Sequence, residues 1–363
     1  MTGARADPRH LARRALLIGA VGTLLAALGA LVDPAASLRA WLAAAFAWTA
    51  VPVGALALLM MAELISGVWR QDLTAPLATA AWTTPLAGLL FLPVLLGIAW
   101  IYPWAADAAP AQEGFRGVYL NAWFFGLRTV IYFALWSVLA ALLLRTRRPQ
   151  PAVAAPGLIL YTLTASLAGV DWGMSLDPEF HSSVYGLIFI THQLLAGFAW
   201  ASAVRLLLDP APAHVPMHAA LLISGLLLWA YLAAMQYIIV WTGDLPDEIA
   251  WYFERSRHGW QLAVWLLALG QVALPFLLLL PSRARRSRRV VGGVALLFLA
   301  MRLLESVWLV LPAFPPSAGG PVLQALLVLA AMAGAGGLWA AAYFHGATRI
   351  PVARRRAEAG GRG

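Results

Sequence analysis

The sequence predicts an all-α membrane protein, and three observations support this prediction. Hydrophobic residues make up 62% of the 363 residues, charged residues only 11%, and the mean hydropathy is +0.77. A single soluble core cannot bury that much apolar surface. Apolar runs recur along the chain at about 20 residues each, the length at which a helix rising 1.5 Å per residue crosses a bilayer. Short connectors containing arginine separate these runs.

Ten apolar runs are long enough to span a membrane, and no connector is long enough to form a soluble domain. We therefore expect residues 1–363 to form one integral membrane domain. The first run follows several arginines and has features of a cleavable signal peptide, but it is long enough to span and further spans follow it. The predicted spans are 13–32, 42–66, 84–106, 122–144, 152–170, 184–207, 217–242, 259–280, 290–311 and 321–344.

The basic residues predict the orientation. All 25 are arginines, and nineteen of them lie on the side of the N-terminus whereas four lie on the other side. Because cytoplasmic connectors are enriched in arginine, both termini are expected in the cytoplasm. Topology thus explains the net charge of +9, so the expected partner is the lipid bilayer and not nucleic acid. The absence of cysteine excludes disulfides, cysteine-ligated iron–sulfur clusters and covalently attached haem in this chain.

Two acidic loops lie on the predicted outer side. The loop 171–186 contains Asp177-Pro178-Glu179, a pattern typical of a helix N-terminus with a cap, a proline and an acidic first turn. The loop 242–254 combines a turn with a short interfacial helix. These loops are candidate docking surfaces for a partner, through Asp177, Glu179, Asp244, Asp247 and Glu248.

Ionisable residues inside the predicted spans are few. Inserting a charged side chain at the centre of a membrane helix costs roughly 2.5 to 3.5 kcal/mol of free energy. Each such residue is therefore expected to have a partner or a function. Arg302 and Glu305 share a helix face and can neutralise one another, either as an ion pair that fixes packing or as part of a proton relay. Glu63, about one turn from the cytoplasmic side, is protonated, extended towards water, or the entry of a proton path.

His192 has three interpretations: haem ligand, proton carrier or hydrogen-bonded packing residue. No second histidine lies well inside a span, which disfavours a bis-histidine haem.

Arg128 and Asp171 are expected to face the same outer side. Arg128 either simply holds a capping Asp171, or the carboxylate accepts protons when a quinol is oxidised. No residue is predicted to bind a metal, and none is predicted with certainty to be catalytic.

Several stretches, covering roughly residues 85 to 314 in the same order, resemble the ActF subunit family of alternative complex III. This family has the NrfD-like fold of polysulfide-reductase membrane subunits. The stretches are Asp171-Trp172-Gly173-Met174-Ser175-Leu176-Asp177-Pro178, Leu120-Asn121-Ala122-Trp123-Phe124-Phe125 leading to Arg128 and Tyr132, Gln236 to Ile249, Ala273-Leu274-Pro275-Phe276, and Met301 to Phe314.

The resemblance implies ten helices, of which the second to fifth and the sixth to ninth form two four-helix bundles, with the first and tenth at the periphery. It implies a subunit of the bacterial inner membrane that is not catalytic alone. In this family the complex oxidises menaquinol or ubiquinol and passes electrons to a cytochrome c or an oxidase. The expected partners are an ActC-like sister subunit, an iron–sulfur subunit, subunits with haem c and a terminal oxidase.

Within that family, ActF is proposed to provide proton half-channels, and it is also described as a second quinone-binding subunit. On this reading the proton-path candidates are Glu63, Asp171, His192, Arg302 and Glu305, and the candidates for a polar network or quinone pocket are Arg128, Asp171 and Tyr132. We expect Arg128, Asp171, Arg302 and Glu305 to form an outer-facing polar network, with Glu63 and His192 on a path from the cytoplasm. This chain has no histidine on its fourth span opposite Asp171, which weakens the quinone interpretation. An alternative from another class is a secondary transporter, since proline-interrupted spans with midplane ionisable residues also suit one.

Overall fold

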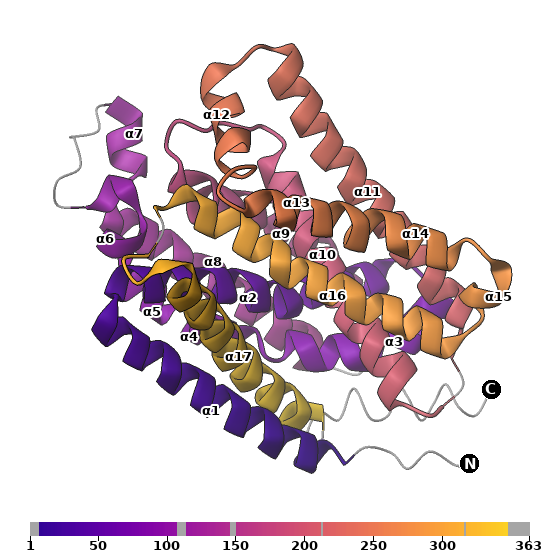
Figure 1. The fold of residues 1–363 in the computed structure, drawn as a ribbon. Coiled ribbons are helices and arrows are strands. Elements are labelled where there is room, and N and C mark those ends of the chain that lie inside the picture. Colours follow the sequence, from indigo (N-terminus) through magenta and orange to yellow (C-terminus); the bar gives the residue numbers. More distant parts are fainter. Residues whose placement is uncertain (1–6, 107–113, 146–149, 212, 316, 348–363) are drawn as a thin grey trace.

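The computed structural model describes residues 7–106, 114–145, 150–211, 213–315 and 317–347. Within these ranges the regular structure is entirely helical, and no strand occurs. Nine helices of the described part are long and apolar enough to cross a membrane, and one bent pair brings the number to ten (Figure 1). The predicted class, an all-α protein that spans the membrane several times, is confirmed.

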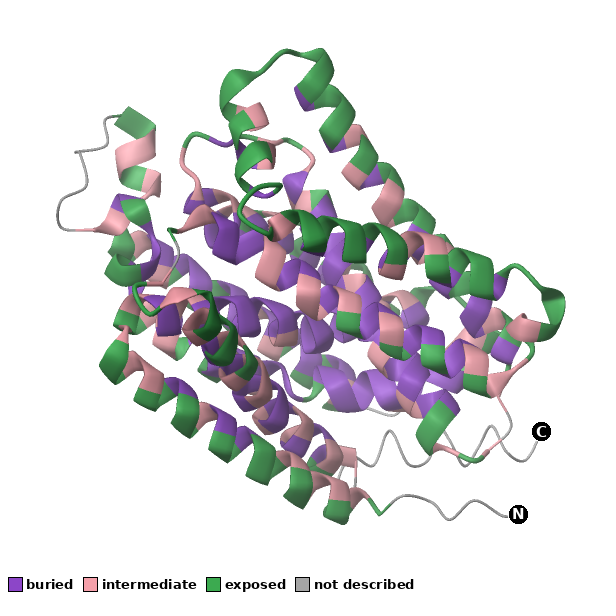
Figure 2. Cartoon of the chain, in the orientation of Figure 1, coloured by how far each residue is buried: buried purple, intermediate pink, exposed green. Residues whose placement is uncertain are grey.

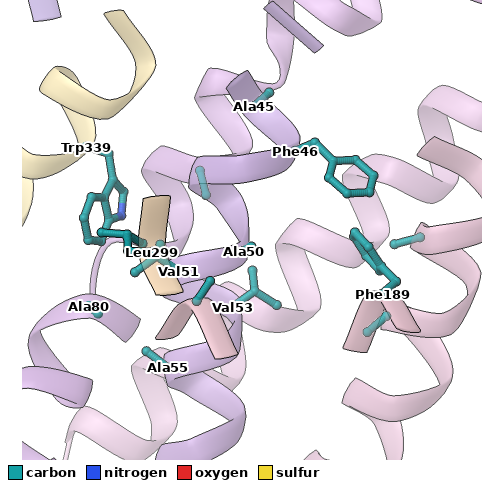
Figure 3. Close-up of a cluster of buried hydrophobic side chains, with 14 of the residues drawn as sticks. Ala45, Phe46, Ala50, Val51, Val53, Ala55, Ala80, Phe189, Leu299 and Trp339 are labelled. Atoms are coloured by element: carbon teal, nitrogen blue, oxygen red, sulfur yellow. The ribbon is translucent and has the colours of Figure 1, made fainter. Parts of the chain in front are cut away.

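Two long helices, α2 (Pro34–Leu64) and α10 (Tyr185–Ala203), form the centre of the molecule. α2 is apolar on every side and almost completely buried, as expected for a helix surrounded by other helices. The two backbones touch where they cross, because a β-carbon on Gly54 would lie 1.8 Å from the carbonyl oxygen of Gln193. Figure 3 shows Phe46 of α2 and Phe189 of α10 pointing towards each other, with ring centroids 4.8 Å apart.

The remaining spans pack around this centre in two groups. The first bundle joins α2 to α3 (Val68–Ala81) with α4 (Thr84–Leu90), to α8 (Ala122–Arg145) and to α9 (Pro151–Trp172). The second joins α10, which continues as the π-helical η3 (Val204–Leu208), to α11 (Val215–Thr242), to α13 (Trp260–Leu267) with η4 (Ala268–Ala273) and α14 (Leu274–Leu279), and to α16 (Arg288–Val310). The short elements are α5 (Leu92–Leu96), α6 (Ile98–Ile101), η1 (Pro103–Ala105), α7 (Gly114–Tyr119), η2 (Met174–Leu176), α12 (Pro246–Glu254), α15 (Ser282–Arg285) and η5 (Leu311–Ala313).

The first and last spans, α1 (Pro8–Val32) and α17 (Gly320–Ala347), lie side by side at the edge of the molecule (Figure 1). Glycines allow this close approach, since a β-carbon on Gly22 would lie 2.4 Å from the backbone nitrogen of Gly334. α17 also packs on α2, whereas most of the α1 surface is exposed (Figure 2). This pair covers one side of the two bundles.

Helical structure begins well before the predicted third span, 84–106. The helical stretch begins at Val68, and α3 meets the segment Thr84–Leu96 at an angle of 41°. Residues 68–81 fall between two predicted spans and include the polar residues Arg70, Gln71 and Asp72. Asp72 is buried instead, and its carboxylate has partners on the second bundle.

Candidate functional site

Most of the buried charged side chains of the described residues gather in three places, which we name by their positions. The α8–α9 pair is Arg128, Tyr132 and Asp171; the central cluster is His192, Trp229, Arg302, Glu305 and Ser306; the inner cluster is Asp72, Ser202, Arg205, His214 and His218. The inner cluster lies at the end of the molecule that carries α15 and Arg288, here called the arginine-rich end. The loop Gly173–Val184 and α12 lie at the opposite end, here called the α12 end.

In the α8–α9 pair, the guanidinium of Arg128 binds Asp171 through two parallel hydrogen bonds. Nε donates to Oδ2 at 2.9 Å and Nη2 donates to Oδ1 at 2.8 Å, while the hydroxyl of Tyr132 donates to Oδ2 at 2.8 Å. Asp171 is fully buried, and Arg128 also lies over the ring of Tyr119, 4.0 Å from its centroid. A carboxylate with three donors in fixed positions is a rigid structural link between α8 and α9.

The central cluster lies inside the second bundle and combines side chains of three helices. His192 Nδ1 and Glu305 Oε2 are 2.7 Å apart, and the indole of Trp229 donates to Glu305 Oε1 at 2.8 Å. Arg302 forms an ion pair with the same carboxylate. On its other side, His192 Nε2 lies 3.3 Å from the hydroxyl of Ser306. Because an imidazole can accept a proton at one nitrogen and release one from the other, this arrangement can pass protons to and from Glu305.

The predicted outer network of Arg128, Asp171, Arg302 and Glu305 is not one network. No hydrogen bond or ion pair between described residues joins the two pairs. Aromatic rings separate them: Trp172, next to Asp171, contacts Phe189 at 6.0 Å, and Phe46 lies between Phe189 and His192 at 4.8 and 5.8 Å. The separation arises because Asp171 lies at the end of α9 in the first bundle, whereas Glu305 lies inside the second.

The inner cluster was not predicted. Arg205 Nη2 donates to Asp72 Oδ1 at 3.1 Å, and the backbone N–H of His214 donates to Oδ2 at 2.7 Å. His218 Nε2 lies 3.5 Å from the same oxygen, and its Nδ1 lies 3.0 Å from the hydroxyl of Ser202. His214 is well exposed whereas His218 is fully buried, so the cluster leads from the surface into the second bundle. Asp72 lies between two predicted spans, so the search for ionisable residues inside spans does not include it.

Glu63 lies in the last turn of α2, at the arginine-rich end of the molecule. Its side chain is 4% exposed and accepts a hydrogen bond from the backbone N–H of Gln150 at 3.0 Å and an ion pair from Arg70 at 3.5 Å. Arg70 on the neighbouring α3 thus supplies a basic partner for Glu63. Glu63 therefore links α2 to the start of α9.

The acidic loops lie at the α12 end. Phe180 stacks on Trp251 with centroids 4.6 Å apart, and the hydroxyl of Ser182 donates to Gln236 at 3.0 Å, so the loop 171–186 is packed against α11 and α12. Asp177 is half-buried, and this burial raises its pKa, against the opposing effect of Arg255. Glu179 forms an exposed ion pair with Arg116. Asp244 and Asp247 are exposed and Glu248 is half-exposed, so all three are accessible to a partner.

Two surface grooves of the described part are lined by apolar side chains and provide no ligand for a polar group. One, of about 650 Å³, lies between α1 and α17; the other, of about 470 Å³, lies between η4 with its flanking helices and α16. Neither offers a side-chain hydrogen-bond donor for the carbonyl groups of a quinone. Within the part of the chain that the structure describes, no three His, Asp or Glu side chains are arranged to hold a metal ion.

The comparisons with known proteins add no family to this geometry. No protein-family model matches the chain, and no curated protein matches it significantly.

Proposed function

We propose that this chain is an integral subunit of a respiratory quinol:electron-acceptor oxidoreductase of the alternative complex III type, in which it conducts protons. The resemblance described above supports the family. The observation that supports proton conduction is the His192–Glu305 pair, a buried imidazole and carboxylate 2.7 Å apart in the middle of a bundle. Burying ionisable side chains inside a membrane costs free energy, so such a pair indicates a functional site.

The inner cluster supports a path that starts at the arginine-rich end. Exposed His214, buried Asp72 and buried His218 form a continuous set of proton-exchanging groups. From Ser202 to His192 the distance along α10 is ten residues, about 15 Å. Apolar side chains such as Leu195 and Ala199 fill this interval. A path through the bundle would therefore consist of two halves separated by an apolar barrier.

Asp171 is the weaker carrier. Its two oxygens already receive three hydrogen bonds, and protonation would break the parallel pair with Arg128. Glu305 shares its oxygens with an imidazole that can itself change protonation state. We therefore assign proton transfer to the central cluster and a structural role to the α8–α9 pair.

The test is proton translocation by vesicles that contain the whole complex. Glu305→Gln and Glu63→Gln are made separately, and the number of protons moved per electron is compared with that of Glu179→Gln, whose carboxylate is exposed. Loss of translocation in Glu305→Gln, with electron transfer retained, supports the proposal. An unchanged ratio in both buried variants contradicts it.

The partners follow from the same proposal. An iron–sulfur subunit, subunits with haem c and an ActC-like sister subunit would bind this chain, with the acidic residues of the α12 end as one docking surface. Mild-detergent purification of the chain tests this directly. Because the chain has no cysteine, c-type haem bands in the purified material must come from partners.

A secondary transporter is the second candidate function, favoured by the bent α3–α4 pair and the π-helical turn η4, since interrupted helices form many transporter sites. The two functions are separated by reconstitution. A transporter moves its substrate in liposomes without other subunits, whereas a subunit of the proposed complex is inactive alone and purifies with redox partners.

A further inference from the structure

The second bundle contains two buried polar side chains whose hydrogen-bonding groups are not satisfied. Gln271, on η4, is fully buried, and neither its amide nitrogen nor its amide oxygen has a hydrogen-bond partner among the described residues. Arg302, on α16, is also fully buried. Its Nη1 pairs with a carboxylate oxygen of Glu305, whereas Nε and Nη2 have no hydrogen-bond partner within the described part.

The backbone positions of these two residues lie at the same level of the second bundle. A β-carbon on Gly270, the neighbour of Gln271, would lie 2.6 Å from the sulfur of Met301, the neighbour of Arg302. α11 contributes Trp229 at this level, since its ring lies 5.0 Å from Arg302 Cζ and its indole binds Glu305. η4, α11 and α16 therefore meet at the level of the bundle that carries Gln271 and Arg302.

The backbone at this place is also irregular. η4 is π-helical, and the N–H of Leu274 bonds to the carbonyl of Leu269, five residues earlier. Pro275 has no N–H to donate to the carbonyl of Gln271, four residues before it. π-Helical turns inside α-helices occur frequently at functional sites. The backbone carbonyl of Gln271 therefore lacks the usual α-helical hydrogen bond from the residue four positions later.

The combination of groups decides what can bind. Unsatisfied amide and guanidinium groups away from water are strongly destabilising, and buried polar groups without a protein partner usually bind water. An anion would be repelled by Glu305, and a cation by Arg302. A ligand here must be small and neutral, accept from the Arg302 and Gln271 nitrogens, and donate to the Gln271 oxygen. Water meets all these requirements.

We propose that η4, α11 and α16 enclose a hydration site in which ordered water bridges Gln271 and Arg302 beside Glu305. The water would connect the central cluster to the carbonyl groups of η4 and extend its polar region across the bundle. Its use as a step in proton transfer rests on the function proposed above, whereas the hydration site itself does not.

Hydroxyl-radical footprinting of the whole complex tests the site, because radiolysis of bound water labels the side chains beside it. We expect Trp229 to be labelled in the natural protein. Gln271→Leu should lower this labelling several-fold, whereas Gln271→Asn, which keeps an amide, should retain most of it. Gln193→Leu is the matched control, since Gln193 is also buried but its oxygen already accepts from Tyr161 at 2.8 Å; it should leave Trp229 unchanged.

Equal Trp229 labelling in the natural protein and in Gln271→Leu, together with a higher melting temperature of the variant, would show a dry site and overturn the proposal. Should Gln271→Leu fail to assemble, a cryo-electron microscopy map of the natural complex decides: density for water within hydrogen-bonding distance of the Gln271 amide supports the site, and its absence from a map that resolves other buried waters overturns it. Hydration without proton movement would contradict only the proposed function.

Discussion

Arg128 and Asp171 join two helices of the first bundle through parallel hydrogen bonds of 2.9 and 2.8 Å, with Tyr132 as a third donor. Both side chains are buried, so neither charge is compensated by water. Removing one partner of a buried ion pair typically costs about 3 to 5 kcal/mol, because the remaining charge is left unpaired.

We therefore expect Arg128→Met to lower the stability of the folded protein by about 3 kcal/mol or more. The double variant Arg128→Met, Asp171→Leu should recover much of this loss, because it leaves no buried charge behind. Thermal unfolding in one detergent measures both. Glu179→Gln is the control, since the ion pair of Glu179 with Arg116 is exposed and should contribute little. A double variant no more stable than the single one would contradict the assignment of a structural pair.

Asp72 gives a second prediction, at the arginine-rich end. Asp72→Asn removes the charge that holds Arg205 and weakens the acceptor for His214, so it should loosen α3 from the second bundle and slow proton uptake from that side. Stopped-flow measurement of proton uptake by oriented vesicles checks the rate. Asp209→Asn provides the control, because Asp209 also pairs with Arg205 but is partly exposed. Equal rates in the two variants would remove Asp72 from the path.

The fold could largely be predicted because an apolar run of about 20 residues by itself indicates a spanning helix, as in α8 and α16. The partners of the charged side chains were harder to predict, since they depend on which helices are neighbours. Arg302 and Glu305 share one helix, so spacing alone paired them. Arg128 and Asp171 required the order of spans, while Asp72 was hidden in a polar stretch.

The partners of Glu305 show the same limit. His192 lies on α10 and Trp229 on α11, more than seventy residues away from Glu305 in the chain. No periodicity within one span reports a contact between spans. The unsatisfied Gln271 was also missed, because a single glutamine in an apolar run is ordinary and only its burial without partners makes it informative.

The α1–α17 contact provides a third prediction. Gly22→Ala places a β-carbon 2.4 Å from the backbone nitrogen of Gly334, so the two helices must separate and the melting temperature should fall. Gly293→Ala is the matched control: it lies inside α16 with nothing within 4 Å of its β-carbon position. There the better helix propensity of alanine should raise stability by up to about 1 kcal/mol. Two changes of the same sign would show that the close approach does not hold α1 in place.

The last prediction concerns Asp33, which caps α2. Its carboxylate accepts from the backbone N–H of Ala36 at 2.9 Å and from the hydroxyl of Ser317 at 2.8 Å. The Ala36 hydrogen bond, as the largest effect, lowers the pKa of Asp33 below its ordinary 3.8. A carboxylate whose pKa is lower in the folded state stabilises the fold at pH values above the ordinary pKa, and this contribution is lost as the pH falls through the folded pKa.

Asp33→Asn keeps an oxygen acceptor for the helix cap but cannot titrate. At pH 7 the natural protein should therefore melt at a higher temperature than Asp33→Asn, and the difference should shrink steadily below about pH 4. Ser317→Ala removes one donor to the same carboxylate. In the Ser317→Ala background, Asp33→Asn should therefore lower the melting temperature at pH 7 by less than it does in the natural protein. Melting curves of the variants in one buffer series measure this. A difference that stays constant down to the lowest pH at which the fold persists would mean that Asp33 holds α2 as a neutral cap, without any contribution from its charge.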